Sequence, residues 1–307
     1  MVRIAGIDCG TNSVKMEVGD VFLTPSGLQM KTVIPRKVWT IRLGEGVEKT
    51  HRLSFNALKK LRPSLEGFKA EILSCGAEHL RFVATSAVRD AENAEEFRKI
   101  VWDVFKTEPE ILTGEQEGKL GFEAACRGEG GGVKLLVDLG GGSTEFALGE
   151  GFTPSFVRSL NIGCVRMAEK FGFGPGPLSP AALESAGGFI REAICDIPIS
   201  RAQRLIGISG TIAVVSFMAA GEKEFSPYRK FEIERSKGME VCEKLMGMSE
   251  EEMERYPIIP PLRRRVIRAG ALIWREILAA SALDCYLFSD AALLDGVILD
   301  EAGKLLL

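Results

Sequence analysis

The sequence has little histidine and no cysteine spacing typical of a metal site. Its two histidines, His51 and His79, lie outside every motif described below, and its seven cysteines are scattered without a Cys-x-x-Cys pair. An odd number of scattered cysteines excludes a disulfide framework and a zinc knuckle. We therefore expect the cysteines to be small buried residues of a protein in a reducing cytoplasm.

The chain also lacks long apolar runs and an excess of positive charge. No apolar stretch is long enough to span a bilayer, and no signal-peptide apolar core follows Met1. The formal net charge is −3 at pH 7, so any polyanion must meet a local basic patch. These absences predict a cytoplasmic protein that binds neither membranes nor nucleic acid.

Enough apolar residues are present to build a large core. Hydrophobic residues make up 46% of the chain and charged residues 26%, which is typical of a globular protein. A length of 307 residues is long for a single core, so two domains are the natural expectation.

A glycine-rich stretch at residues 135–149 reads Leu-Leu-Val-Asp-Leu-Gly-Gly-Gly-Ser-Thr-Glu-Phe-Ala-Leu-Gly. The apolar run before the glycines and the alternating run after them predict a strand, a tight turn and a second strand. Gly140, Gly141 and Gly142 let backbone N–H groups converge on an anion, Ser143 adds a hydroxyl, and Asp138 can hold a divalent cation. An ordinary glycine-rich hairpin is the alternative.

The same pattern occurs twice in the chain. A spacing of 130 residues separates Asp8 from Asp138, Gly10 from Gly140, Ser13 from Ser143 and Gly19 from Gly149. Four matched positions within apolar strands predict duplicated domains that face one another across a cleft. Two anion-binding turns would suit a run of linked phosphates.

Between the two turns the chain has the pattern of an α/β domain. Ser54 predicts a helix N-cap, Pro63 a kink or break in that helix, and Asn93 a second N-cap that forms a capping box with Glu96. Another helix begins at Gly114. Its acidic residues Glu115 and Glu117 fit a helix start, where the dipole favours carboxylates.

The second half continues the α/β pattern. Residues 205–211 predict a strand that ends in Gly210 and Thr211, and Asn161 or Gly163 begins a helix, either with N–H groups free for phosphate or with a plain Asn cap. We predict a surface loop at residues 222–237. The arginines of residues 262–268 form either the lining of a polyanion channel or a solvated helix face.

Five segments together resemble the exopolyphosphatase and guanosine pentaphosphate phosphohydrolase family, within the sugar kinase, Hsp70 and actin superfamily. The segments are Gly6–Ser13, Ala84–Asn93, Thr113–Gly118, Val137–Glu145 and Gly207–Thr211. At 307 residues the chain is similar to the short, two-domain members.

The resemblance implies an α/β fold of two similar ribonuclease H-like (actin-like ATPase) domains, each with a mixed sheet, facing an interdomain cleft. The expected domains are residues 1–122 and 123–307. The last helix, at about 290–307, is expected to pack back on the first domain.

The resemblance also implies a role for each matching residue. Glu117 matches the catalytic base, which would deprotonate the water that attacks the terminal phosphorus. Asp138, Glu145 and Asp8 match acidic positions associated with Mg²⁺, and a requirement for K⁺ is left open. The phosphate-binding positions that match are Gly10, Thr11, Asn12, Ser13, Arg89, Gly140, Gly141, Gly142, Ser143, Gly210 and Thr211.

The implied activity is release of terminal orthophosphate from inorganic polyphosphate or guanosine pentaphosphate, by a homodimer. Three positions depart from the family pattern. Gln116 replaces a glutamate, which leaves Glu115 as a rival base; Lys15 replaces an arginine; and Leu294-Asp295-Gly296 replaces Arg-Glu-Gly. A non-catalytic sensor of polyphosphate or phosphorylated guanosine nucleotides therefore remains an alternative, as does a kinase with a second acceptor substrate.

Overall fold

The computed structural model describes residues 1–25, 27–226 and 229–307. The chain divides into two compact units, Met1–Ala124 with Leu293–Leu307, and Ala125–Ala292. The second unit thus ends at Ala292 and not at residue 307, because the last helix packs on the sheet of the first unit.

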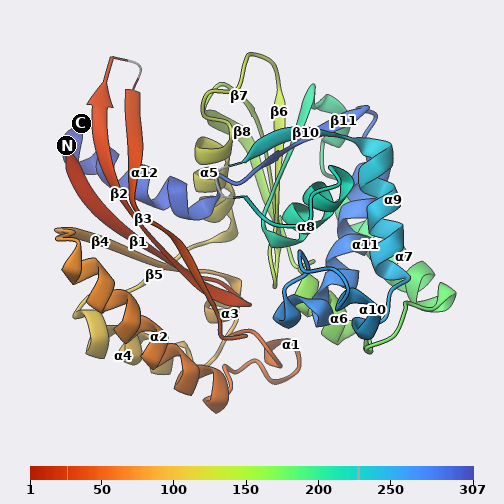
Figure 1. Cartoon of the computed structure of the whole chain (residues 1–307), viewed down its shortest axis with the longest axis horizontal. Helices are drawn as coiled ribbons and strands as arrows, with labels where there is room; N and C mark the ends of the chain where they lie inside the picture. Colours follow the sequence, from red (N-terminus) through yellow and green to blue (C-terminus); the bar gives the residue numbers. More distant parts are fainter. Residues whose placement is uncertain (26, 227–228) are drawn as a thin grey trace. The chain divides into compact units, whose positions relative to one another are not determined.

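The first unit contains a five-stranded sheet and its helices (Figure 1). Its elements are β1 (Val2–Cys9), β2 (Ser13–Thr24), β3 (Gly27–Thr40), α1 (Val47–Thr50), α2 (Phe55–Ser74), β4 (His79–Ala84), α3 (Ser86–Arg89), α4 (Ala94–Phe105), β5 (Glu110–Ile111), α5 (Gly114–Ala125) and α12 (Leu293–Leu306).

Alternate residues of β1 face opposite sides of this sheet. Ala5, Ile7 and Cys9 join the core formed with α2 and α4, whereas Ile4 packs with α12 on the other face. Gly6 permits that contact, since a Cβ there would lie 2.7 Å from Ile298. In Figure 1 α12 crosses the strands of this sheet, and it contacts β1, β2, β3 and β4.

The second unit contains a six-stranded sheet and a large core. Its elements are β6 (Lys134–Leu139), β7 (Thr144–Glu150), β8 (Thr153–Leu160), α6 (Cys164–Lys170), α7 (Pro180–Ile194), η1 (Ile199–Arg201), β9 (Arg204–Ile208), α8 (Gly210–Ala219), β10 (Lys230–Glu234), α9 (Arg235–Met246), α10 (Glu250–Met253), η2 (Pro261–Arg263), α11 (Arg264–Ala280) and β11 (Cys285–Ser289).

The two sheets share one topology. The strand order is β3-β2-β1-β4-β5 in the first and β8-β7-β6-β9-β11-β10 in the second. In both, the first strand pairs antiparallel with the second and parallel with the fourth. Only β10, an antiparallel edge strand, has no counterpart among the described strands of the first unit. The predicted fold of two similar α/β domains, each with a mixed sheet, is confirmed.

Several local predictions were wrong. Of the kink or break predicted at Pro63, the break is wrong, because the α2 helix runs through that residue to Ser74. Asn93 does not form a capping box, because its side-chain oxygen accepts a hydrogen bond from the backbone N–H of Leu53 at 2.7 Å. Residues 222–237 contain β10 and the start of α9 and are not one loop; residues 227 and 228 lie outside the described part. The β10 segment reads Lys-Phe-Glu-Ile-Glu, with Ile233 buried and Phe231 partly buried, so an alternation of polar and apolar residues marks that edge strand.

The predicted N-cap at Ser54 is confirmed, because its hydroxyl accepts from the N–H of Ala57. Ser179 caps α7 in the same way through Ala182. Across residues 1–25, 27–226 and 229–307, no helix combines the length and apolarity needed to cross a membrane.

Candidate active site

The two predicted turns have the same backbone geometry. In the first, the N–H of Gly10 donates to the carbonyl of Ser13 at 3.0 Å, and in the second the N–H of Gly140 donates to the carbonyl of Ser143 at 3.0 Å. The residues on either side of each turn pair at the ends of the two strands. Cys9 pairs with Val14 in the first turn, and Leu139 pairs with Thr144 in the second. The sequence repeat is therefore a structural repeat.

The carbonyls of the second turn are occupied by the start of α6. Cys164 donates its N–H to Gly140 at 3.0 Å, and Val165 donates to Gly141 at 2.8 Å. Gly163 is required for this approach, because a Cβ there would overlap the Gly141 carbonyl. The predicted helix start at Gly163 is confirmed, but Asn161 is not the N-cap, and the first N–H groups of α6 are not free for phosphate.

The carbonyls of the first turn are bound in the equivalent way. The N–H of Gly44 donates to Thr11 at 2.8 Å, and the N–H of Arg42 donates to Asn12 at 2.9 Å. A Cβ at Gly44 would overlap the Thr11 side chain. In each unit, the connection after the third strand thus fixes the turn from its carbonyl side.

The backbone N–H groups at the tips of both turns remain available. Within the described part of the chain, those of Thr11, Asn12, Gly141 and Gly142 donate to no protein acceptor. Two successive N–H donors with no competing acceptor form an anion-binding arrangement. The hydroxyls behave differently, because Thr11 Oγ1 is 2.8 Å from Ser86 Oγ and is already engaged.

The aspartates that precede the turns have different partners. Asp8 is 2% exposed, and its Oδ2 accepts from Lys15 Nζ at 3.0 Å, whereas its Oδ1 is buried with no hydrogen-bond partner among the described residues. Asp138 lies opposite Glu145 in the β6–β7 ladder. Glu145 is fully buried, and its Oε1 accepts from Ser159 Oγ at 2.7 Å.

Two carboxylates directly opposite each other are unfavourable unless a cation lies near them. The described residues contain no group of three or more His, Cys, Asp or Glu placed to hold a metal. A pair of carboxylates is nevertheless enough for Mg²⁺, which keeps several waters and also takes phosphate oxygens as ligands. Asp138 and Glu145 therefore fit the predicted ion.

Glu117 and Arg89 come together in the first unit. Glu117 lies in the first turn of α5 and is 7% exposed, and its Oε2 is 3.6 Å from Arg89 Nη1. Arg89 Nη1 also donates to the carbonyl of Leu112 at 2.8 Å. The rival base Glu115 is exposed. A buried carboxylate beside a guanidinium is typical of a catalytic group, and Glu117 has this environment. The exposed Glu115 does not have it.

Gln116 has a structural role at the start of the same helix. Its side-chain oxygen accepts from the N–H of Thr113 at 2.8 Å, while Thr113 Oγ1 accepts from the N–H of Gln116 at 3.2 Å. This is a capping box. The Thr-x-x-Gln spacing was visible in the sequence and could have identified it.

One arginine of the run at residues 262–268 lies against the Gly210–Thr211 segment. The Arg263 guanidinium covers Gly210 so closely that a Cβ there would overlap it. Burial lowers the pKa of Arg263, although the neighbouring Cys164 opposes this. The backbone N–H of Arg263 donates to the carbonyl of Pro260 at 2.8 Å, whereas its guanidinium has no hydrogen bond or ion pair with any described residue. A partly desolvated cation at the start of α8 favours an anion beside it.

The other arginines of this region do not form one solvated face. Arg268 is fully buried and donates to the carbonyls of Met248 and Gly174, at 3.1 and 2.5 Å. Arg264 pairs with Glu254 at 2.8 Å. Arg263 therefore lies next to the predicted phosphate loop, whereas Arg264 and Arg268 bind other parts of the protein. Only the tertiary contacts distinguish these roles.

A comparison with protein-family models matches residues 22–305 to the Ppx/GppA phosphatase family. The chain belongs to this family. The curated relatives include exopolyphosphatase 2 of Mycobacterium tuberculosis, 32% identical over 99% of both chains. Another is guanosine-5'-triphosphate,3'-diphosphate pyrophosphatase of Photobacterium profundum, 27% identical over 98% of this chain and 59% of that protein.

Solved structures of the family match as well. A crystal structure of an exopolyphosphatase-like protein has a TM-score of 0.92 and 34% identity, and covers 100% of this chain and 99% of that one. The predicted family and fold class are confirmed, and the chain is a phosphohydrolase of the Ppx/GppA type.

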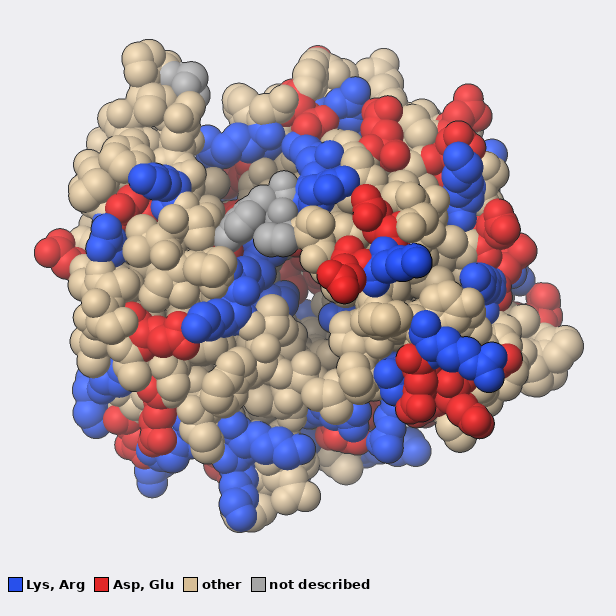
Figure 2. Space-filling view, in the orientation of Figure 1, with Lys and Arg blue, Asp and Glu red and all other residues tan. Residues whose placement is uncertain are grey.

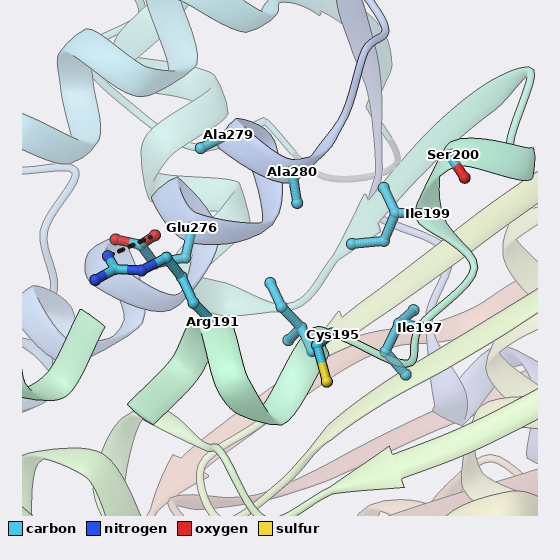
Figure 3. A pocket seen from close by; sticks show the side chains of 9 residues that line it. Arg191, Cys195, Ile197, Ile199, Ser200, Glu276, Ala279 and Ala280 are labelled. Carbon is cyan, nitrogen blue, oxygen red and sulfur yellow. Dashed lines mark hydrogen bonds and ion pairs between the residues drawn. The ribbon is translucent and has the colours of Figure 1, made fainter. Parts of the chain in front are cut away.

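A cavity of about 380 Å³ in the second unit lies apart from these family motifs (Figure 3). Isoleucines and alanines of α7, η1 and α11 line it, and Arg191 pairs with Glu276 at 3.4 Å at its polar end. No predicted site residue lines it.

Figure 2 shows basic and acidic side chains interspersed over the visible face, as expected for a net charge of −3.

Proposed function

We propose that this Ppx/GppA family member releases terminal orthophosphate from inorganic polyphosphate or guanosine pentaphosphate by attack of water, with Mg²⁺ as its metal. The observation that carries the proposal is Glu117, a buried carboxylate 3.6 Å from Arg89 at the start of α5. The names of the relatives supply the substrate class. A cytoplasmic homodimer is the state in which we expect the enzyme to act.

In this reaction Glu117 accepts a proton from water while the water oxygen bonds to the terminal phosphorus and the anhydride P–O bond breaks. Arg89 orients the phosphoryl oxygens and limits charge build-up on them. The N–H groups of Gly141 and Gly142, with those of Thr11 and Asn12, bind phosphate oxygens, as do the Gly210–Thr211 segment and Arg263.

Asp138 and Glu145 would hold Mg²⁺. When bound, the ion would neutralise charge on the phosphoryl oxygens. Asp8 differs, because Lys15 already supplies a cation to one of its oxygens. Its role as a third metal-associated residue, the interdomain cleft and a requirement for K⁺ stay predictions.

The non-catalytic sensor is less well supported. It was motivated by Gln116 and by the altered segment Leu294–Gly296. Gln116 forms a capping box, and Asp295 accepts from Arg36 at 2.6 Å, so both departures have structural explanations that leave Glu117 unaltered.

Phosphate release tests the proposal directly. Wild type, Glu117→Gln and the matched control Glu115→Gln are assayed on long polyphosphate, short polyphosphate and guanosine pentaphosphate, with and without Mg²⁺. We expect Glu117→Gln to lose roughly 100- to 10,000-fold in kcat and Glu115→Gln to keep its activity. Full activity of a folded Glu117→Gln variant would sink the assignment of the base. Binding without any turnover by the wild type would instead favour the sensor.

A further inference from the structure

Glu117 and Arg89 rest on a small core of their own. The main core of the first unit joins the sheet to α2 and α4. A separate cluster of buried residues consists of Val83, Leu112, Leu120, Leu293 and Val297. Leu120 is one helical turn beyond Glu117, and the carbonyl of Leu112 accepts the hydrogen bond from Arg89. Two of the five residues belong to α12, the C-terminal helix.

The contact between α12 and α5 depends on a glycine. A Cβ at Gly296 would overlap the carbonyl oxygen of Leu120, a backbone atom that cannot turn away. Ion pairs fix α12 at this point and beyond it. Arg36 forms ion pairs with Asp295 of α12 at 2.6 Å and with the buried Glu17 of β2 at 3.2 Å. Arg81 forms ion pairs with Asp300 of α12 and with Glu110.

A different face of α12 has another task. Ile298, Leu299 and Ala302 pack with Ile4 and Val21 on the sheet. The helix therefore has one face that attaches it to the sheet and one face, with Leu293, Gly296 and Val297, that supports α5.

We propose that the second face of α12 positions the proposed base. Gly296 and Val297 are then positioning residues for the reaction, acting through Leu120 and Leu112 on Glu117 and Arg89. The proposal rests on the assignment of Glu117 given above. It explains why the chain returns to its first unit after completing the second: the C-terminal helix supplies part of the support beneath Glu117.

The first test compares two glycines of α12. Gly296→Ala should lower kcat roughly 10- to 100-fold with little change in KM, because a small displacement of a catalytic group is enough to produce such a loss. Gly303→Ala is the control, since the nearest atom to its Cβ would be Leu28 Cδ1 at an ordinary 3.7 Å. Equal kcat in the two variants overturns the proposal.

A second pair covers the case in which Gly296→Ala does not fold. Val297→Ala and Val21→Ala each remove two methyl groups from a fully buried valine. Val297 is on the face of α12 that packs with Leu120, and Val21 is the β2 residue that packs against the other face. Both should lower the melting temperature, but only Val297→Ala should lower kcat, by roughly tenfold. If kcat falls equally in both variants, α12 has only a structural role and the positioning proposal is wrong.

The two assignments fail in different ways. If Glu117→Gln is fully active, the base is wrong whatever α12 does. If Glu117→Gln is inactive while Val297→Ala and Gly296→Ala keep the wild-type kcat, the base stands and the positioning role is wrong.

Discussion

In both units an aspartate is the next-to-last residue of the first strand, Asp8 in β1 and Asp138 in β6. Opposite this aspartate, the first unit carries Lys15 and the second carries Glu145. The backbone around them is the same, with an N–H to carbonyl hydrogen bond of 3.0 Å across each turn and a glycine packed against each turn from the following connection. The charges are opposite. The first turn contains an ion pair, Lys15 with Asp8, and the second places two carboxylates together.

We interpret this difference as a separation of two proposed tasks on one duplicated fold. The ion pair within the first turn gives Asp8 a cation of its own, whereas the two carboxylates of the second turn are where we propose that Mg²⁺ binds. A change of residue at one register position would then distinguish the proposed phosphate-binding turn from the proposed metal-binding one.

Among changes to the two turns, the largest expected effect comes from removing one carboxylate of the acidic pair. Glu145→Gln should lower Mg²⁺-dependent phosphate release roughly 100- to 1000-fold, because one of two metal-binding carboxylates is lost. Ser159→Ala removes only the hydrogen bond to Glu145 and should cost about 10-fold. Both are measured as phosphate release against Mg²⁺ concentration. An unchanged Mg²⁺ dependence in Glu145→Gln would contradict the assignment of the metal to this turn.

The two connecting glycines should differ in how well they tolerate a methyl group. At Gly163 the added Cβ meets the backbone of Gly141, whereas at Gly44 it meets the side chain of Thr11. Gly163→Ala should therefore lower the free energy of unfolding by about 1–3 kcal/mol and Gly44→Ala by less. Denaturant unfolding measures both. The reverse order would show that the turns are not supported in the same way.

Lys15 should matter for stability even without a ligand. Lys15→Met leaves the buried Asp8 carboxylate without its ion pair, and we expect a loss of about 1–2 kcal/mol in the free energy of unfolding. Lys37→Met is the control, because its ion pair with Glu71 is more exposed and should contribute less than about 1 kcal/mol. Similar losses in the two variants would mean that the Asp8–Lys15 pair is only a surface contact.

The smallest effect concerns the residues that follow β4 and β9. Ser209 has φ 90°, a strained value for a residue with a side chain, and its Oγ donates to Leu139 at 2.5 Å, whereas Thr85 has φ −122°. Ser209→Gly should be more stable than Ser209→Ala by about 1 kcal/mol, since glycine relieves the strain. At Thr85 the order should be reversed. Thermal unfolding of the four variants decides the matter.

The local features of the site followed from the sequence. Glycine runs, strand alternation and the spacing of Asp, Gly and Ser act within a few residues, so the two turns and their strands could be predicted. Ser54 was recognised as a cap for the same reason. Asn93 was misread because its side chain bonds to Leu53, a residue 40 positions away.

The contacts that complete the site are long-range. Nothing near Arg263 in the sequence indicates that its guanidinium covers Gly210, and nothing near Gly296 indicates the carbonyl of Leu120. The N–H groups that begin α6 were predicted as either free or Asn-capped, and the structure gives them to Gly140 and Gly141. Each of these contacts depends on which distant segment the fold places beside the residue.

The sequence by itself determined the duplication, the strand–turn–strand units, the family and the residue types at each turn, because these depend on backbone freedom and short-range patterning. The tertiary structure decided which of Glu115 and Glu117 is buried beside Arg89, which arginine reaches the Gly210–Thr211 segment, and that the C-terminal helix supports Glu117. These depend on close packing between residues far apart in the chain, such as Val83 and Val297, which are separated by 297 − 83 = 214 positions, and such packing leaves no local signal.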